Sequence, residues 1–226
     1  MWKEFVSLFY PRVCLSCDRS LNSVEEHICL PCRLSLPLTN YHKNLENPIA
    51  QKLRNTCNVN HAFAYLKYYR KGIAQKILKD LKYNGNSEVG VLVGKWFGEE
   101  LTIAGMENTF DVVAPIPLHP LKLKRRGYNQ SEKITEGLTE ALQTEHSPCL
   151  LKRTVYTQTQ TQKGMSERWT STQQIFELGD NVDLSEKHVL ILDDVITTGA
   201  TVESAVNCLW RAKPKAISVC ALASGQ

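Results

Sequence analysis

The strongest indication of the fold is the segment Val189-Leu190-Ile191-Leu192-Asp193-Asp194-Val195-Ile196-Thr197-Thr198-Gly199-Ala200-Thr201. Its four leading apolar residues predict a strand that is buried on both faces, as in a parallel sheet. Two adjacent carboxylates, Asp193 and Asp194, then stand at the expected carboxyl end of that strand, where open α/β sheets bind ligands. The loop that follows consists of Thr197, Thr198, Gly199, Ala200 and Thr201. Its N–H groups and hydroxyls, together with the N-terminus of the next expected helix, predict an anion site.

The same stretch resembles the phosphoribosyl-diphosphate (PRPP) motif of type I phosphoribosyltransferases. That motif has four hydrophobic residues, two acids, two hydrophobic residues and then Thr-Thr-Gly-x-Thr, and this chain matches every position. The resemblance implies that Asp193 and Asp194 are catalytic and face the ribose hydroxyls, while residues 197–201 bind a phosphate. The alternative is a buried strand followed by a capped helix without a ligand, which leaves the repulsion between two adjacent carboxylates unexplained.

Two Cys-x-x-Cys pairs lie near the amino terminus, Cys14 with Cys17 and Cys29 with Cys32, and eleven residues separate them. Such pairs place four thiolates tetrahedrally around one ion, so we expect a closed structural zinc site. A disulfide pair or free thiols are the alternatives; residues 1–10 do not form a secretory segment, which argues against disulfides. The remaining cysteines are scattered and are expected as small core residues: Cys57, Cys149, Cys208 and Cys220.

Composition and charge are those of a globular chain. Of the 226 residues, 42% are hydrophobic and 22% charged, and no apolar stretch is long enough to span a bilayer. The net charge of +4 is unevenly spread, because residues 61–130 carry 11 basic and six acidic side chains. A basic surface ahead of the acidic motif suits a polyphosphate or nucleic-acid partner. For Lys76, Lys79 and Lys82, a solvated basic face is the alternative.

Apolar periodicity predicts strands over residues 61–69, 111–115 and 216–222, besides the strand of the acidic motif. It predicts helices over residues 72–83, 88–104 and 131–142, and a short helix near 49–54. Strands that alternate with helices give a doubly wound, mainly parallel α/β sheet. We therefore expect a zinc-ribbon module over residues 1–36, a linker over 37–60 and an α/β domain over 61–226.

A basic loop is expected after the short strand that ends near Pro115. It contains Lys122, Lys124, Arg125 and Arg126, and it precedes Gly127-Tyr128-Asn129-Gln130. Cations at the carboxyl end of a strand would neutralise a diphosphate. We expect this loop at the same sheet edge as the phosphate loop. The sequence therefore predicts that its cations bind a diphosphate or DNA beside that loop.

Together the motifs resemble the ComF family, which joins an amino-terminal double-CxxC zinc finger to a phosphoribosyltransferase-like domain. The resemblance covers nearly the whole chain: the four cysteines, Leu81-Lys82-Tyr83-x-Gly85, residues 115–130, Gln160…Glu167-Arg168…Phe176 and the acidic motif. It implies PRPP and magnesium at the acidic motif and structural zinc at the cysteines. It also implies a cytoplasmic, competence-associated protein that handles incoming single-stranded DNA in natural transformation. A competence helicase is an implied partner, and partners would place the protein at the inner face of the membrane.

The sequence allows two interpretations of residues 157–172 and two of the protein's function. Gln160 and Arg168 lie in a polar run over residues 157–172, which is long enough for a lid over the site or for a surface loop without a catalytic part. The family pattern is not kept there at Ser171, Thr172 and Gln174. The protein is a PRPP-binding module of DNA uptake or, alternatively, an active phosphoribosyltransferase of nucleotide metabolism with an unspecified acceptor.

Overall fold

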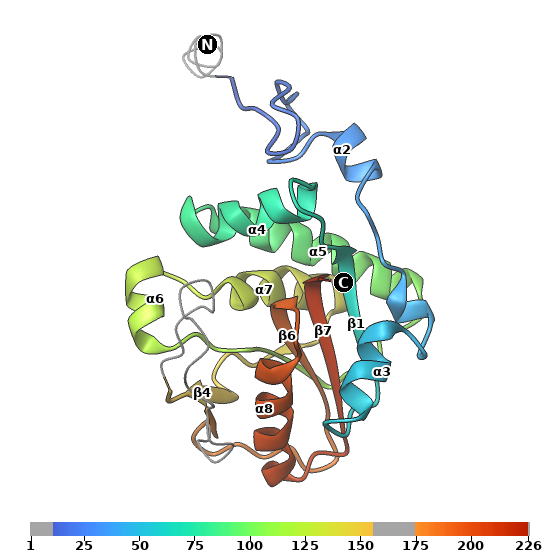
Figure 1. Ribbon diagram of the computed structural model, residues 1–226, viewed down its shortest axis with the longest axis vertical. Helices are drawn as coiled ribbons and strands as arrows, with labels where there is room; N and C mark the ends of the chain where they lie inside the picture. Colours follow the sequence, from blue (N-terminus) through green and yellow to red (C-terminus); the bar gives the residue numbers. More distant parts are fainter. Residues whose placement is uncertain (1–10, 156–174, 226) are drawn as a thin grey trace.

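The computed structural model describes residues 11–155 and 175–225 of the chain (Figure 1). Its strands are β1 (Ala62–Lys67), β2 (Val112–Pro115), β3 (Glu145–His146), β4 (Leu151–Arg153), β5 (Phe176–Leu178), β6 (His188–Ile196) and β7 (Ala216–Ser224). Its helices are α2 (Leu30–Leu34), α3 (Pro48–Arg54), α4 (Ile73–Tyr83), α5 (Ser87–Ile103), α6 (Pro120–Arg126), α7 (Gln130–Leu142) and α8 (Ala200–Leu209), with 3-10 turns η1 (Tyr41–Lys43) and η3 (Trp210–Ala212). Five strands form one parallel sheet in the order β1-β7-β6-β2-β3, and β4 and β5 form an antiparallel pair.

Helices cover both faces of this sheet, and the side chains of β6 alternate between them. Leu190 and Leu192 belong to the apolar core that also contains residues of α4, α5 and α7. Val189 and Ile191 belong to a second core, which they share with residues of α3 and α8. A strand covered on both faces has no polar side, which explains the unbroken apolar run of β6. The predicted α/β class with a mainly parallel sheet is confirmed.

β2 and β6 are neighbours whose following connections run to opposite sides of the sheet. From β2 the chain passes through α7 to β3, and from β6 it passes through α8 to β7. Open α/β sheets bind ligands at such a reversal, outside the carboxyl ends of the two strands. We call this position the switch point. The acidic motif on β6 and the basic segment after β2 both flank it.

The end of β6 differs from the expectation that this strand stops at Leu192, whereas β2 ends at Pro115 as predicted. β6 does not end at Leu192 but runs on through both acids to Ile196, because β7 continues to Ser224 and pairs with it. β2 ends earlier, at the pairing of Pro115 with Leu192. The acid pair therefore lies in a part of β6 that is still paired to β7 but is no longer paired to β2.

The basic segment after β2 is the helix α6 and not the expected loop. Pro120 stands at its first position, where a fixed φ favours a helix and the missing N–H costs nothing. Gly127, with φ of 88°, ends it in a left-handed conformation that suits glycine. The cations of its last turn also interact favourably with the helix dipole.

Residues 37–60, expected as a linker, pack onto the sheet. Leu53 of α3 is 1% exposed and lies in the core shared with α8. Asn47 caps α3 through its Oδ1 and donates its Nδ2 to the carbonyl of Ala62 at 2.8 Å. Leu38 forms a β-bridge with Leu66. This segment thus joins the edge of the domain and carries the short helix that was predicted.

The other predicted strands and helices are confirmed with boundaries shifted by up to two residues. Cys57, Cys208 and Cys220 are buried as expected. Cys149 is exposed, which corrects its prediction, because it lies in the turn that precedes β4. Among the described residues, no helix combines the length and the apolar character needed to cross a membrane.

Candidate functional site

Asp193 and Asp194 are adjacent residues in the part of β6 that extends beyond the end of β2. Asp193 Oδ1 accepts a hydrogen bond from the N–H of Asp194 at 2.8 Å. Burial raises the pKa of Asp193 to about 7, and the charge of Asp194 adds to the rise. A carboxyl group with a pKa near neutrality can give or accept a proton at physiological pH.

Lys82, from the last turn of α4, supplies a counter-charge to this pair. Its Nζ lies 2.7 Å from Asp194 Oδ2, and the two side chains are 27% and 18% exposed. This contact favours a role in the site over the solvated basic face that was the alternative for Lys82. The segment Leu81-Lys82-Tyr83-x-Gly85, part of the family resemblance, was the sequence signal that could have located it.

Arg153 of β4 is a second cation that acts on the acid pair. Its guanidinium lies over the ring of Phe176, 5.4 Å from the ring centroid. Burial lowers the pKa of Arg153, and the charge of Asp193 opposes that change. Sequence reasoning missed Arg153 because β4 has only three residues and no recognisable motif.

α6 brings the predicted basic side chains into the same neighbourhood. Burial lowers the pKa of Lys122, and four nearby cations lower it further: Arg153, Arg126, Arg125 and Lys82. Lys124 is exposed on the same helix. Cations from α4, α6 and β4 thus converge beside the switch point, and an anion placed there would relieve their mutual repulsion.

The predicted phosphate loop joins β6 to α8. Gly199 has φ of 89°, and a Cβ atom there would lie 3.0 Å from Leu53 Cδ2, so both the backbone conformation and α3 favour glycine. Gly199 is the N-cap of α8 and offers no side chain to its first N–H groups. Lys52 of α3 donates to the carbonyl of Thr197. The loop therefore presents a helix N-terminus and threonine hydroxyls, which can bind a phosphate.

The structure brings the acid pair, the loop over 197–201 and the α6 cations to one edge of the sheet. Gln160 and Arg168 lie outside the described residues. Carboxylates accept hydrogen bonds from hydroxyl groups, while the loop and the cations attract phosphates. The described part of the site can therefore hold a sugar with a phosphate on one side and a more highly charged anion on the other.

A separate cluster lies at the amino-terminal end of the described chain. The Sγ atoms of Cys14, Cys17, Cys29 and Cys32 all lie within 4.8 Å of one another. Cys17 Sγ and Cys29 Sγ are 3.7 Å apart. Four thiolates around a tetrahedral zinc ion, each about 2.3 Å from it, stand about 3.8 Å apart. The donor set and its spacing therefore fit zinc, and we call this group the four-cysteine cluster.

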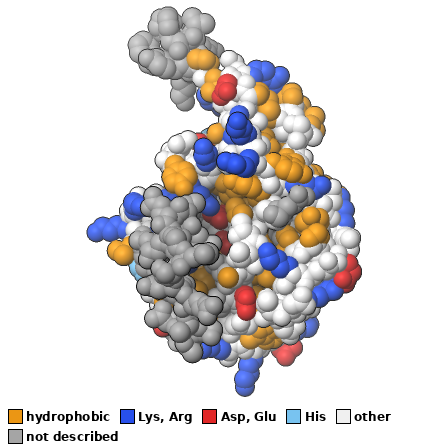
Figure 2. Space-filling view, viewed as in Figure 1, with side chains coloured by type: hydrophobic (Ala, Val, Ile, Leu, Met, Phe, Trp, Pro, Cys, Tyr) orange, Lys and Arg blue, Asp and Glu red, His pale blue; other side chains and the backbone are white. Residues whose placement is uncertain are grey.

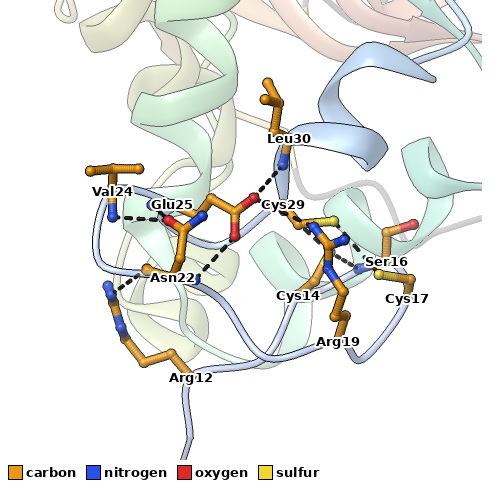
Figure 3. A network of polar contacts seen from close by, with 10 residues as sticks. All are labelled: Arg12, Cys14, Ser16, Cys17, Arg19, Asn22, Val24, Glu25, Cys29 and Leu30. Carbon is orange, nitrogen blue, oxygen red and sulfur yellow. Dashed lines mark hydrogen bonds and ion pairs between the residues drawn. The ribbon is translucent and has the colours of Figure 1, made fainter. Parts of the chain in front are cut away.

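Hydrogen bonds arrange the loop around the four-cysteine cluster (Figure 3). Glu25 accepts from the N–H of Leu30 at 2.8 Å and from that of Asn22 at 3.1 Å. These two bonds lower the pKa of Glu25, and Arg19 contributes. The N–H groups of Ser16 and Cys29 each lie 3.4 Å from Cys14 Sγ.

The segment that carries this cluster, which we call the four-cysteine module, is attached to α4 and α5. Lys76 of α4 donates to the carbonyl of Ser16, between the first two cysteines. Arg33 lies 3.0 Å from Glu99 of α5 and stacks 4.5 Å over the ring of Trp96. α4 therefore contacts the module through Lys76 and the acid pair through Lys82.

Comparisons with known proteins agree with this architecture. Residues 140–226, which contain the acidic motif, match the phosphoribosyl transferase domain family. The chain is 26% identical to the competence protein ComFC of Bacillus subtilis (strain 168), over 92% of this chain and 81% of that protein. It is also 26% identical to ComFC of Streptococcus pneumoniae, over 93% and 86% of the two chains. The DNA utilization protein YhgH of Escherichia coli (strain K12) is 27% identical over 63% of each chain.

The parallel sheet, the acidic motif at its switch point and the domain match define a phosphoribosyltransferase-like protein. The four-cysteine cluster at its amino-terminal end and the near full-length similarity to the ComFC proteins narrow that class. The chain is therefore similar over nearly its whole length to ComFC competence proteins and over part of it to a DNA utilization protein, and it carries a phosphoribosyl transferase domain match.

Proposed function

We propose that the protein binds PRPP at the switch point and handles single-stranded DNA in natural transformation. One observation supports the first half: the acid pair shares one edge of the sheet with the loop over 197–201 and with cations from α4, α6 and β4. Asp193 and Asp194 would accept hydrogen bonds from the ribose hydroxyls. The loop over 197–201 would hold the 5-phosphate, while Lys122, Lys124, Arg125 and Arg126 would neutralise the diphosphate. Magnesium, when bound, would supply charge that the carboxylates and the diphosphate share.

Calorimetric titration with PRPP and magnesium tests this site. Asp194→Asn keeps the shape of the side chain but removes its charge, so we expect PRPP to bind about tenfold to 100-fold more weakly. Exposed Glu107 gives the control, and Glu107→Gln should bind PRPP as the wild type does. If Asp194→Asn binds PRPP with unchanged affinity, the assignment of the acid pair is wrong.

The alternative function is catalysis of phosphoribosyl transfer, and the raised pKa of Asp193 favours it. A carboxyl group with a pKa of about 7 can exchange a proton with an acceptor near neutral pH. The carboxylates would also stabilise positive charge that develops at C1 as the diphosphate leaves. Release of diphosphate from PRPP, measured with candidate acceptors, distinguishes transfer from binding. A pure binding module is stabilised by PRPP but releases no diphosphate.

DNA handling is supported by the names of the relatives and by the basic surface. Figure 2 shows Lys and Arg side chains over the four-cysteine module and α4, and again at the left edge, where α6 lies. Single-stranded DNA bound there should lose affinity steeply with salt, with a slope of about −0.7 per phosphate contacted. Alanine at Lys124, Arg125 and Arg126 together should flatten that slope in a fluorescence anisotropy titration.

The matched control replaces three exposed cations near the opposite end of the sheet, at Arg211, Lys213 and Lys215. That variant should keep the wild-type slope, since these residues precede β7 and lie far from α6 (Figure 1). If the α6 variant binds DNA like the wild type at every salt concentration, α6 has no part in DNA binding. Competition by saturating PRPP would indicate a shared site.

The four-cysteine cluster completes the proposal. We infer that it holds one structural zinc ion in a module over residues 1–36, which the segment over 37–60 joins to the phosphoribosyltransferase-like domain over 61–226. The module would present DNA, or a competence helicase, to that domain on the cytoplasmic side of the membrane. Zinc content of the purified protein, measured without chelators, tests the metal assignment.

A further inference from the structure

Lys82 occupies a position between the acid pair and the basic helix α6. On one side, its Nζ lies 2.7 Å from Asp194 Oδ2. On the other side, its charge contributes to the lowered pKa of Lys122 on α6. One ammonium group thus stands within electrostatic reach of two surfaces of opposite sign.

The backbone that carries Lys82 is fixed on both sides. The neighbouring carbonyl of Leu81 accepts hydrogen bonds from Tyr128 Oη at 2.6 Å and from Gln130 Nε2 at 3.4 Å. Asn84 Nδ2 donates to Asp80 Oδ1 at 2.7 Å and closes the end of the helix. Tyr128 and Gln130 belong to the segment that follows α6, so these bonds hold the end of α4 close to the basic helix.

The side chain itself is free to exchange partners. A lysine ends in a compact charge on a flexible four-carbon stem, so its ammonium can change partner without moving the backbone. Both members of the ion pair are partly exposed, at 27% and 18%, and water or a ligand can reach them. A partly exposed pair of this kind costs little to separate when each member gains another charged partner.

Resting on the PRPP site proposed above, we propose that Lys82 is an exchangeable counter-ion for ligands that combine a ribose with a diphosphate. Without a ligand, its ammonium offsets the repulsion between Asp193 and Asp194. When the ribose hydroxyls and magnesium engage the carboxylates, Lys82 leaves Asp194 and pairs with the diphosphate. A ligand must offer both halves to make this exchange favourable, so the site selects sugar diphosphates over sugar monophosphates.

The test compares two ligands on two charge variants. Lys82→Met keeps most of the stem and removes the charge, while Lys82→Arg keeps the charge. At saturating magnesium we expect Lys82→Met to bind PRPP about tenfold to 100-fold more weakly in calorimetry, because a charge-assisted contact to the diphosphate is lost. Ribose 5-phosphate has no diphosphate, so its affinity should stay equal or increase once no lysine competes for Asp194. Lys82→Arg should retain PRPP binding within about threefold of wild type.

Lys79 gives a matched control, because it is an exposed lysine of the same helix. Lys79→Met should bind both ligands as the wild type does. If Lys82→Met binds PRPP with wild-type affinity, or weakens both ligands equally, the exchange does not occur. If the wild type itself binds no PRPP, the proposed function fails, and this inference fails with it.

A second variant covers the case in which Lys82→Met does not fold. The double variant Lys82→Met with Asp194→Asn removes both charges of the pair and leaves no unpaired ion at this contact. Compared with Asp194→Asn alone, it should bind inorganic diphosphate about tenfold more weakly. Equal diphosphate affinity of these two variants would show that Lys82 does not contact the diphosphate and would overturn the proposal.

Discussion

The four-cysteine cluster and the acid pair of β6 both crowd groups that repel one another once ionised, but they offset this repulsion with different partners. At the cluster the partners are main-chain N–H groups, those of Ser16 and Cys29, at 3.4 Å from Cys14 Sγ. At the acid pair one main-chain N–H, that of Asp194, also donates to Asp193, but the counter-charges lie on the side chains of Lys82 and Arg153. Main-chain donors cannot leave without unfolding their loop, whereas a lysine side chain can turn away.

Main-chain hydrogen bonds favour the thiolate form at Cys14 but not at Cys32. Burial alone would raise the pKa of Cys14, but hydrogen bonds from the backbone of Cys29, Cys17 and Ser16 outweigh it and lower the pKa to about 6. Burial raises the pKa of Cys32 to about 12, and the neighbouring thiols add to this rise. A cation at the centre favours all four thiolates together. The cluster therefore suits a permanent metal ion, while the acid pair suits a ligand that comes and goes.

The largest expected effect is the loss of zinc and of local structure at the four-cysteine cluster. Cys29 is 1% exposed, and Cys29→Ser removes a thiolate from the centre of the cluster. Because zinc binding and folding of such a module are linked, we expect the zinc content to fall from about one ion per chain to none, with loss of structure over 11–36. Elemental analysis and protease sensitivity measure the two effects.

The control for this variant is Cys149→Ser, which changes an exposed thiol outside the cluster. It should keep its zinc and its resistance to protease. A Cys29→Ser protein that retains both would contradict the zinc assignment and would leave the four-cysteine cluster as a group of free thiols.

An intermediate effect is expected from the pH dependence of the acid pair. The pKa of Asp193 is about 7 in the folded protein and 3.8 in the reference state. The folded state therefore holds a proton that the unfolded state releases, and the free energy of unfolding falls as the pH rises from about 4 to 7. The change is at most about 4 kcal/mol for a shift of this size.

Asp193→Asn removes that titration, since its amide stays neutral. We expect this variant to be more stable than the wild type at pH 8 and to lose its advantage progressively as the pH falls toward 4. Urea unfolding at several pH values measures the difference, with Glu107→Gln as a control that keeps the wild-type pH profile. If the Asp193→Asn variant is less stable than the wild type at pH 8, then the ionised Asp193 carboxylate does not destabilise the folded protein, and the prediction is wrong.

How far the sequence predicts these two sites depends on how local each one is. Both CxxC pairs and the run from Val189 to Thr201 are continuous, so spacing alone indicates a metal cluster and a strand that leads into a phosphate loop. Lys82 and Arg153 come from α4 and β4, far away in the chain, and only packing brings them to Asp194 and Asp193. The segment Leu81-Lys82-Tyr83-x-Gly85 could have marked Lys82 as a site residue, but no local pattern says which carboxylate it pairs with, and Arg153 lies in no recognisable motif.

The strand and helix ends show the same limit. β6 runs past Leu192 because β7 extends beside it, and no property of the acids themselves predicts that. The basic segment forms α6 because Pro120 and Gly127 mark its two ends, and these signals were present in the sequence. The fold class could be predicted because it depends on alternating apolar runs, whereas the exact boundaries depend on neighbours.

The smallest expected effect concerns the link between the two sites. Lys76 donates to the carbonyl of Ser16, so α4 connects the four-cysteine cluster to the ion pair at Asp194. Lys76→Met removes this hydrogen bond at a partly buried contact, and we expect a loss of about 1 kcal/mol in module docking. Zinc should then pass to a chelator a few times faster, while PRPP affinity stays within about twofold of wild type. Lys79→Met, on the same helix, should change neither quantity. If Lys76→Met instead weakens PRPP binding as strongly as Lys82→Met does, the two sites act as one unit, and their contrast as a permanent and an exchangeable site does not hold.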